Sequence, residues 1–249
     1  MNELQEKLLR TLEHLIKFFN DNDINYFLSS GSCLGAIRHK GFIPWDDDID
    51  IFIKRQDYEK LLNICYNYNG SDFCFSKIDS PSYPFPFLKF YNKEYPVVDK
   101  RMLKKFENIF LYIDIFPIDY IDEKKIAKSL CKQKILKNLF FCKTIKSHKK
   151  NKILVLGGRV LSMPFSINYL KKKLNKLGAS DKTSIMMDIC WGTKPFSSEY
   201  FDDYLEVPFE TLIVRVPKNF DGYLKAIYGD YMKLPAECDR KSHDLSKLD

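Results

Sequence analysis

A short run in which aspartate alternates with isoleucine constrains the fold of this chain more than any other feature. Asp48 and Asp50 stand two residues apart and alternate with three isoleucines over residues 48–54. Because successive side chains of a β-strand point to opposite faces, this run predicts a strand. Both carboxylates would share one face, and the isoleucines would enter the core from the other.

A third aspartate occurs in the same kind of setting farther along the chain. Asp114 is flanked by isoleucines within a run, residues 109–116, that also predicts a strand. Like-charged carboxylates repel each other unless a cation lies between them, and Mg²⁺ is bound by such carboxylates together with substrate phosphates. We therefore predict that Asp48, Asp50 and Asp114 are catalytic residues that hold one or two Mg²⁺ or Mn²⁺ ions for displacement at phosphorus.

The acidic segment has two other possible interpretations, a calcium-binding loop and an ordinary acidic turn. The spacing of Asp46, Asp48 and Asp50 matches the start of a calcium-binding loop, but that loop requires Gly at its sixth position and Glu at its twelfth. Ile51 and Asp57 occupy those positions, which excludes a loop of this kind. An ordinary acidic turn would not explain an aspartate within an apolar run.

A Gly-Ser pair precedes the acidic segment. The apolar run at residues 24–29 predicts a strand, after which Ser32 is expected to cap a short helix that continues to about Lys40. Backbone N–H groups at the start of a helix bind phosphate, so Gly31 and Ser32 are candidate substrate-binding residues. Three basic residues at the other end of this helix can either pair with a phosphate or simply balance the partial charge of the helix end. They are Arg38, His39 and Lys40.

Composition narrows the class of protein. With 249 residues, of which 45% are hydrophobic, the chain can form one large domain or one domain with an added lobe. It contains no apolar stretch long enough for a transmembrane helix, and its first residues do not form a signal-peptide pattern. The seven cysteines include no C-x-x-C pair. This argues against a zinc ribbon or a disulfide scaffold and agrees with the reducing environment of the cytoplasm.

Positive charge is concentrated in one part of the chain. The net charge is +7, and between Lys124 and Lys176 there are fifteen Lys, one Arg and no acidic residue. Apolar residues recur at helical spacing there, which predicts a basic helical lobe. Such a lobe is either a solvated surface or a binding surface for an anionic partner, such as a membrane or a nucleic acid.

The segment from Leu34 to Asp50 carries a family resemblance. It reads Leu-Gly-Ala-Ile-Arg-His-Lys-Gly-Phe-Ile-Pro-Trp-Asp-Asp-Asp-Ile-Asp and resembles the signature of the LicD family, while fukutin-related proteins carry a similar Pro-Trp-Asp-x-Asp-x-Asp element. Later parts of the chain continue the match. They are residues 113–119, residues 228–235, Arg240 and His243.

The resemblance implies a fold and a division of the chain. The expected fold is α+β, with a nucleotidyltransferase-like mixed sheet, flanking helices and an added helical lobe. Residues 1–122 would form the catalytic core and residues 123–200 the basic lobe. Residues 201–249 would return to the core and the active site.

The resemblance also implies an activity. LicD-like enzymes transfer a substituted phosphate from a CDP-linked donor to a sugar of a cell-surface glycan, such as a teichoic acid, a capsule or a lipopolysaccharide. Phosphocholine from CDP-choline is the group most expected here, with a polyol phosphate next. Gly31 and Ser32 would face the donor phosphates, and six further residues would contact substrate. They are Arg38, His39, Lys40, Asp46, Arg240 and His243.

A choline head group requires an aromatic face, for which Trp191, Tyr228 and Tyr231 are candidates. Two other functions stay open. A nucleotidyltransferase could act on a small molecule or on RNA, although the basic lobe lacks the regular aromatic residues of single-strand binders. An inactive scaffold would not need its aspartates. We expect no nucleic-acid partner, a lipid-linked or surface glycan as acceptor, and a cytoplasmic enzyme whose lobe contacts the anionic inner face of the membrane.

Overall fold

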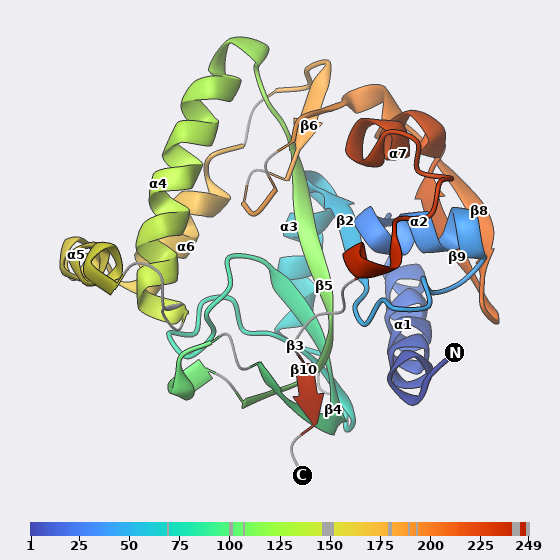
Figure 1. Cartoon of the computed structure of the whole chain (residues 1–249), viewed down its shortest axis with the longest axis horizontal. Coiled ribbons are helices and arrows are strands. Elements are labelled where there is room, and N and C mark those ends of the chain that lie inside the picture. The colour runs from blue at the N-terminus through green and yellow to red at the C-terminus, as the bar shows by residue number, and fades with distance from the viewer. Residues whose placement is uncertain are drawn as a thin grey trace.

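The computed structural model describes residues 1–68, 70–99, 102–106, 108–145, 152–178, 181–188, 190–192, 194–240 and 245–247. It shows an α+β protein built around a mixed sheet (Figure 1), which confirms the expected fold class. The strands are β1 (Phe27–Leu28), β2 (Asp50–Lys54), β3 (Phe73–Phe75), β4 (Leu88–Asp99), β5 (Asn108–Tyr120), β6 (Ile185–Met187), β7 (Phe196–Ser197), β8 (Tyr204–Phe209), β9 (Leu212–Pro217) and β10 (Leu245–Lys247). The α-helices are α1 (Glu3–Asp21), α2 (Ser30–His39), α3 (Arg55–Cys65), α4 (Ile126–Thr144), α5 (Lys152–Ser162), α6 (Ile167–Asn175) and α7 (Phe220–Tyr228).

The sheet has the strand order β1-β2-β5-β4-β10, with β3 added to β4 and β6 added to β5. β2 and β5 are parallel neighbours, whereas the other described pairings of the sheet are antiparallel. Ile51, Ile53, Ile113 and Ile115 are buried, as the alternation of apolar residues predicts. The two central strands therefore carry their aspartates on the face away from this part of the core.

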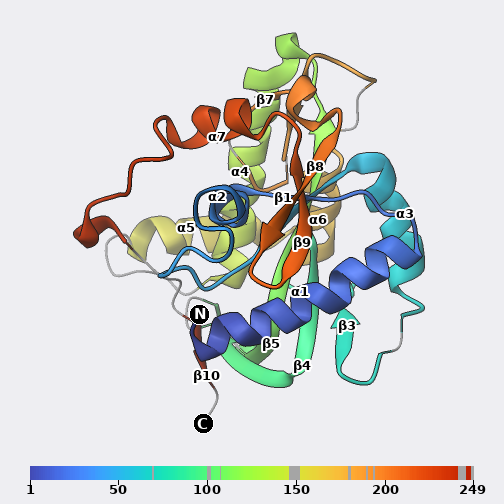
Figure 2. The same cartoon turned by 90° about the vertical axis from the view of Figure 1, so that its right-hand side faces the viewer.

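The first helix closes one side of the sheet. Leu8, Leu12, Leu15 and Phe19 recur at helical spacing on α1 and are fully buried, and the helix contacts β4 and β5 (Figure 2). Its start is fixed by a capping box, in which Asn2 and the third helical residue exchange hydrogen bonds. The spacing of these apolar residues thus agrees with the helix that the structure shows.

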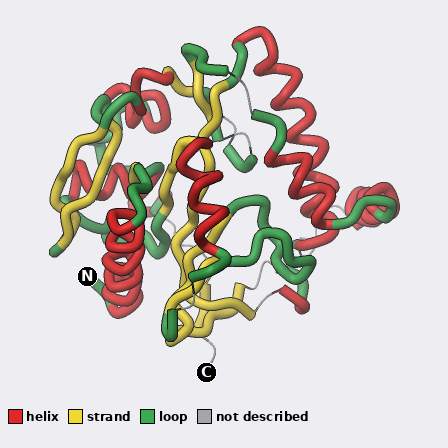
Figure 3. The backbone as a smooth tube through the Cα atoms, turned by 180° about the vertical axis from the view of Figure 1, so that it is seen from behind, coloured by secondary structure: helices red, strands yellow, loops and turns green. Residues whose placement is uncertain are grey.

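α3 follows β2 directly and packs against β2 and β5; Figure 3 shows it in front of the strands when the molecule is seen from behind. Its buried face carries Tyr58, Leu61 and Cys65. At its start, Arg55 forms a bidentate ion pair with Asp119 near the end of β5, with both N–O distances at 2.7 Å. This buried pair fixes the helix against the strand that carries Asp114.

The basic lobe is helical, as predicted. α4 contacts both α5 and α6, and the three helices lie together on one side of the sheet (Figure 1). On the other side, the β8–β9 hairpin and α7 pack against α2 and β1. The division into three parts stays a prediction. Among the described residues, no helix combines the length and the apolar character needed to cross a bilayer.

Candidate active site

The three predicted carboxylates meet at one cavity. Asp50 and Asp114 lie directly opposite each other in the register of β2 and β5. Asp48 lies just before β2, because the strand begins at Asp50 and not at Asp48 as expected. All three residues line a cavity of about 290 Å³. The two neighbouring strands therefore bring together side chains that are more than sixty positions apart in the sequence.

The cavity brings several carboxyl groups close together. Burial raises the pKa of the Asp50 carboxyl group well above its ordinary range, and the neighbouring carboxylates of Asp48 and Asp114 raise it further. A carboxyl group in this position gains from any cation that enters the cavity. The site is thus electrostatically suited to bind a positively charged ion or ligand.

Lys89 lines the same cavity, and the sequence pattern did not indicate it. It lies on β4 directly opposite Asp114 in the antiparallel register, and only 1% of its side chain is exposed. Its ammonium group forms an ion pair with the Asp114 carboxylate and lies 3.3 Å from the ring centre of Tyr112 and 4.5 Å from that of Phe85. The sequence did contain one signal for Lys89. A lysine within the apolar run at residues 85–91 is as unusual as an aspartate within such a run.

Ser32 does not cap α2, contrary to the prediction. The helix begins at Ser30 with Ser29 as its N-cap, and the hydroxyl of Ser32 accepts a hydrogen bond from the backbone N–H of Asp50 at 2.9 Å. The helix starts earlier because the N–H of Cys33 donates to the carbonyl of Ser29 at 3.0 Å. Ser30 has a φ of 48°, and its N–H donates to the hydroxyl of Tyr223 at 3.0 Å. Ser32 therefore ties the first turn of α2 to the start of the acidic strand. A contact of Ser32 with phosphate stays a prediction.

Gly31 and Asp46 border a second, larger cavity of about 630 Å³. A Cβ atom at Gly31 would stand 2.8 Å from Oδ2 of Asp46, so the glycine is what allows this carboxylate to lie against the first turn of α2. Five of the other lining residues are aromatic or basic. They are Arg38, Trp45, Tyr228, Tyr231 and Lys233.

The predicted basic contacts occupy different places. The guanidinium of Arg38 lies in the wall of the second cavity but is engaged, since it donates to the carbonyl of Tyr231 at 2.7 Å. Arg240 reaches the same region, with its guanidinium carbon 4.7 Å from the ring centre of Trp45. Arg38 thus lines the second cavity, whereas Arg240 packs on Trp45, which lines it.

The remaining predicted contacts are not brought into either cavity. Among the described residues that line the two cavities, His39 and Lys40 do not occur. His39 accepts a hydrogen bond from Nε of Arg38 at 3.0 Å, and Lys40 is exposed at the end of α2 with a φ of 56°. His243 lies outside the described residues, so its place in the site stays a prediction.

Aromatic rings form much of the remaining wall of the aspartate cavity. They belong to Phe85, Phe87, Tyr112, Phe116, Phe140, Phe141 and Trp191. Of the three aromatic residues predicted for a choline head group, Trp191 lines this cavity, whereas Tyr228 and Tyr231 line the second one. Trp191 is held from α4 by Lys137, whose ammonium donates to its carbonyl and lies 4.6 Å from its ring centre.

The donor atoms of the site suit a hard cation. In the described part of the chain, no three His, Cys, Asp or Glu side chains are gathered closely enough to hold a metal ion together. Mg²⁺ commonly takes only one or two carboxylates, with waters and substrate phosphates completing its shell. Asp48 and Asp50 fit this mode, whereas Asp114 is ion-paired with Lys89. The predicted metal role of the three aspartates stays a prediction.

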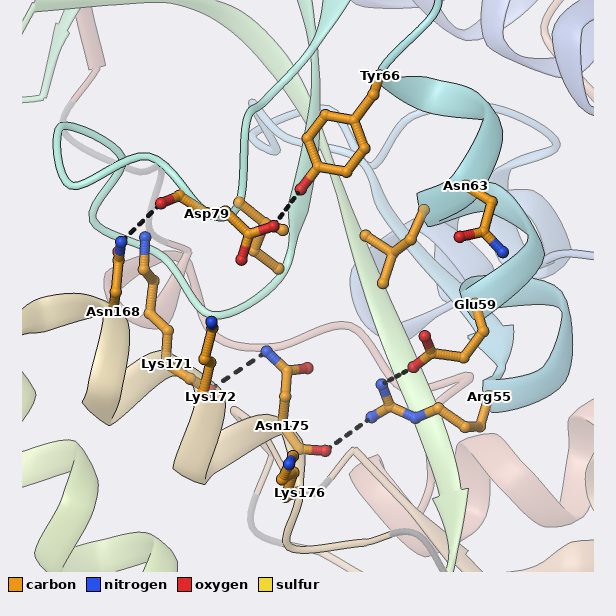
Figure 4. A pocket seen from close by; sticks show the side chains of 12 residues that line it. Arg55, Glu59, Asn63, Tyr66, Asp79, Asn168, Lys171, Lys172, Asn175 and Lys176 are labelled. Carbon is orange, nitrogen blue, oxygen red and sulfur yellow. Dashed lines mark hydrogen bonds and ion pairs between the residues drawn. The ribbon is translucent and has the colours of Figure 1, made fainter.

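A separate pocket of about 340 Å³ lies between α3 and α6 and contains none of the predicted site residues (Figure 4). Lys171 is buried there, and its ammonium donates to the carbonyls of Ser80 and Tyr83 at 2.8 Å each. Arg55, on the other side, donates to Glu59 and Asp119. These bonds fasten α6 and α3 to their surroundings, which indicates a structural role.

Residues 23–135 match the family model described as LicD/FKTN/FKRP, nucleotidyltransferase domain. This region includes the three aspartates, Lys89 and the first turn of α2. The chain therefore carries a nucleotidyltransferase domain of the LicD type, which confirms the family resemblance.

Comparison with individual proteins supports the same relationship over a longer range. The chain is 26% identical to the lipopolysaccharide cholinephosphotransferase LicD of Haemophilus influenzae, in a match that covers 99% of this chain and 97% of that protein. Over 59 residues it is 36% identical to the ribitol-5-phosphate transferase FKTN of Mus musculus, covering 24% of this chain and 13% of that protein. Over 50 residues it is 38% identical to the human ribitol 5-phosphate transferase FKRP, covering 20% and 10%. These similarities support a phosphotransferase enzyme.

Proposed function

We propose that this chain transfers phosphocholine from CDP-choline to a sugar of a cell-surface glycan, with Mg²⁺ or Mn²⁺ as cofactor. One observation carries the choice of head group: the cavity that contains the three aspartates is also lined by Trp191 and six other aromatic rings. Quaternary ammonium groups bind to the faces of aromatic rings, and carboxylates add electrostatic attraction. A polyol head group, as in the ribitol phosphate relatives, would instead require hydrogen-bonding partners that the faces of such rings supply poorly.

The two cavities suggest how a CDP-linked donor would lie. Asp46 lines the larger cavity and Asp48 the smaller one, so the acidic segment lies between them. We assign the cytidine to the larger cavity, where Trp45 and Tyr228 offer rings, and the head group to the smaller one. The diphosphate would then lie along the acidic segment, close to the N–H groups of the first turn of α2.

The residues of the site have distinct roles in this reaction. Asp48 and Asp50 would hold the metal ion, which when bound neutralises the charge of the diphosphate. The acceptor hydroxyl oxygen bonds to the phosphorus that carries the head group, its proton passes to a carboxylate of the cavity, and CMP leaves. Catalysis of this kind depends mainly on positioning and charge, which β2 and β5 supply by fixing Asp50 opposite Asp114.

The test is a comparison of donors. Purified protein would be incubated with a candidate glycan and with CDP-choline, CDP-ethanolamine, CDP-glycerol or CDP-ribitol, and the release of CMP would be measured. We expect release to be fastest with CDP-choline, to stop with a chelator and to return with Mg²⁺ or Mn²⁺. Faster release from CDP-ribitol would move the assignment to polyol phosphates. Attachment of a nucleotide to the acceptor, or full activity after exhaustive chelation, would contradict the proposal.

The acceptor and the place of action complete the proposal. We infer that the acceptor is a lipid-linked glycan and that the enzyme works at the cytoplasmic face of the membrane, held there through its basic lobe. The support is the uninterrupted positive charge between Lys124 and Lys176 and the apolar residues that α5 exposes at the margin of the molecule, Val160 and Leu161.

A further inference from the structure

Lys89 has a role in the site that goes beyond holding the fold. We propose that it is the resident counter-ion of the aspartate cluster, and that it makes binding of the metal ion dependent on binding of the donor. The proposal rests on the metal-dependent transfer proposed above. It concerns the order and coupling of binding, and it assigns a positioning role to a residue in the centre of the sheet.

The ammonium group of Lys89 is surrounded by aromatic rings and by the Asp114 carboxylate. The side chain is 1% exposed, and rings surround its end: the ring centres of Tyr112, Phe85 and Phe87 are 3.3, 4.5 and 5.5 Å from Nζ. The Asp114 carboxylate closes the remaining side as an ion pair. The ammonium is therefore held against Asp114 in the wall of the aspartate cavity.

Burial of a charged lysine requires compensation. An ammonium group removed from water is costly unless a carboxylate and further contacts stabilise it, and here Asp114 does so directly, while the negative charge of Asp50 adds attraction. The aromatic faces contribute cation–π attraction. The pair is mutually dependent, since Asp114 would otherwise be a carboxylate among apolar residues.

This arrangement has a consequence for the metal ion. The described residues offer no group of three carboxylates that could hold a cation, and Asp114 is engaged by Lys89. A divalent ion entering the free enzyme meets Asp48 and Asp50 together with a fixed positive charge nearby. That charge repels the ion, but it attracts the diphosphate of a donor. Metal and donor should therefore bind weakly alone and strongly together.

The test is a titration of Mn²⁺ followed by electron paramagnetic resonance, with and without CDP as a non-reacting probe. In the absence of CDP, Lys89→Met is expected to bind Mn²⁺ at least roughly tenfold more tightly than the wild-type protein, because a nearby positive charge is removed and Asp114 is released. In the wild-type protein CDP should tighten Mn²⁺ binding, and in the variant this gain should be much smaller. If Lys89 only held Asp114 in place as a metal ligand, the variant would bind Mn²⁺ more weakly, which would overturn the proposal.

Three variants serve as controls. Lys89→Arg keeps the charge and should retain the CDP dependence. The double variant Lys89→Met with Asp114→Asn removes the pair and should lose the gain in Mn²⁺ affinity. Lys171→Met removes a lysine that is also buried but that contacts backbone carbonyls, and it should leave Mn²⁺ affinity unchanged. A change in Mn²⁺ affinity with Lys171→Met as large as with Lys89→Met would overturn the proposal.

Thermal unfolding gives a second readout. Mn²⁺ should raise the melting temperature of Lys89→Met more than that of the wild-type protein, since the ion replaces the lost counter-ion. Should Lys89→Met not fold, Lys89→Gln, which retains a hydrogen-bond donor for Asp114, takes its place with the same expectations. An absence of Mn²⁺ binding in the wild-type protein even with CDP would contradict the proposed function. Tight, CDP-independent binding in the wild-type protein would overturn this inference alone.

Discussion

Asp50 and Lys89 carry opposite charges at positions where their neighbours in sequence are largely apolar. Each would be unfavourable alone in the centre of a sheet, because a buried charge without a partner is strongly destabilising. The strand register brings both next to Asp114, where the ammonium group of Lys89 compensates part of the negative charge. Apolar side chains would pack more simply at these positions. We therefore attribute the three charged residues to the chemistry of the site.

The first prediction concerns the carboxylates that would hold the metal ion. Asp48→Ala and Asp50→Ala are each expected to reduce turnover by about a hundredfold or more, because several kcal/mol of charge stabilisation are lost and each 1.4 kcal/mol corresponds to about tenfold in rate. Release of CMP at saturating donor and metal measures this. Without metal, neither variant should melt below the wild-type protein, since a like-charged neighbour has been removed.

Asp202 provides a matched control, since it is an exposed aspartate outside both cavities. Asp202→Ala should keep its turnover. Near-normal turnover in Asp48→Ala or Asp50→Ala would contradict the assignment of the catalytic residues.

A second prediction concerns the head group. Trp191→Ala is expected to raise the KM for CDP-choline roughly tenfold, because a cation–π contact at a desolvated site is worth up to about 2 kcal/mol, and Trp191→Phe should retain most of the affinity. The inhibition constant of CDP, which lacks the head group, should be unchanged. An equal loss of affinity for CDP and CDP-choline would show that Trp191 does not bind the head group.

The sequence predicted the site residues whose pattern is local. It did not predict those whose role depends on contacts between distant segments. Alternation with isoleucine revealed Asp48, Asp50 and Asp114, because the pattern of a strand is local. Lys89 was not predicted because its role depends on which residue lies opposite it on the neighbouring strand. Ser32 was predicted as a helix cap because its actual partner, the backbone N–H of Asp50, lies 18 positions away in the sequence and is brought close only by the fold.

The same contrast holds for whole elements. β2 and β5 were predicted because their apolar residues have a clear period. β4 continues to Asp99 although Asn92, Lys93 and Glu94 interrupt its apolar pattern, because it pairs with β5 and β10. The close contact of α2 with α7 and the β8–β9 hairpin joins segments far apart in the chain, which periodicity does not reveal.

A third prediction belongs to the loop after β6, which carries Trp191. The Asp188 carboxylate, on a residue only 4% exposed, accepts hydrogen bonds from the N–H groups of Trp191 and Gly192 at 2.9 and 2.8 Å. Burial raises the pKa of Asp188 to about 7, well above its ordinary value of 3.8. The group therefore contributes stability that is fully present below about pH 4 and is lost as the pH rises through about 7.

Asp188→Asn cannot ionise and should remove this dependence. Between pH 5 and pH 8 the wild-type protein is expected to lose about 2–3 kcal/mol that the variant keeps, which corresponds to a relative gain of about 5 °C or more in the melting temperature of the variant. The wild-type protein and the variant must be compared at several pH values. The amide that replaces the Asp188 carboxyl group accepts fewer hydrogen bonds at every pH, so only the change with pH reports on ionisation. The exposed residue variant Asp202→Asn is the control. A difference in melting temperature that does not change with pH would contradict the prediction.

At the scale of the whole molecule, the active site and the basic lobe lie next to each other. α4 supplies Phe140 and Phe141 to the wall of the aspartate cavity. The same helix also packs against α5. A surface that contacts α5 would therefore bring an acceptor close to the cavity. The lysines proposed to bind such a surface include Lys143, Lys146, Lys149 and Lys150, of which the last three lie outside the described residues.

The last prediction is that this lobe binds anionic membranes. At the end of α5, Val160, Leu161 and Met163 are 55%, 69% and 71% exposed, in a region without a single acidic residue between Lys124 and Lys176. Apolar residues can enter the headgroup region, and each lysine near an anionic surface adds about 1 kcal/mol within a Debye length. Sedimentation with liposomes should show binding to anionic lipid at low salt that weakens at high salt, with little binding to neutral lipid. Leu161→Ser with Met163→Ser should weaken binding without changing turnover on a soluble acceptor, whereas Leu205→Ser, at an exposed position on β8, should not. Equal binding to both lipids, or none to anionic lipid at low salt, would contradict the prediction that the lobe binds anionic membranes.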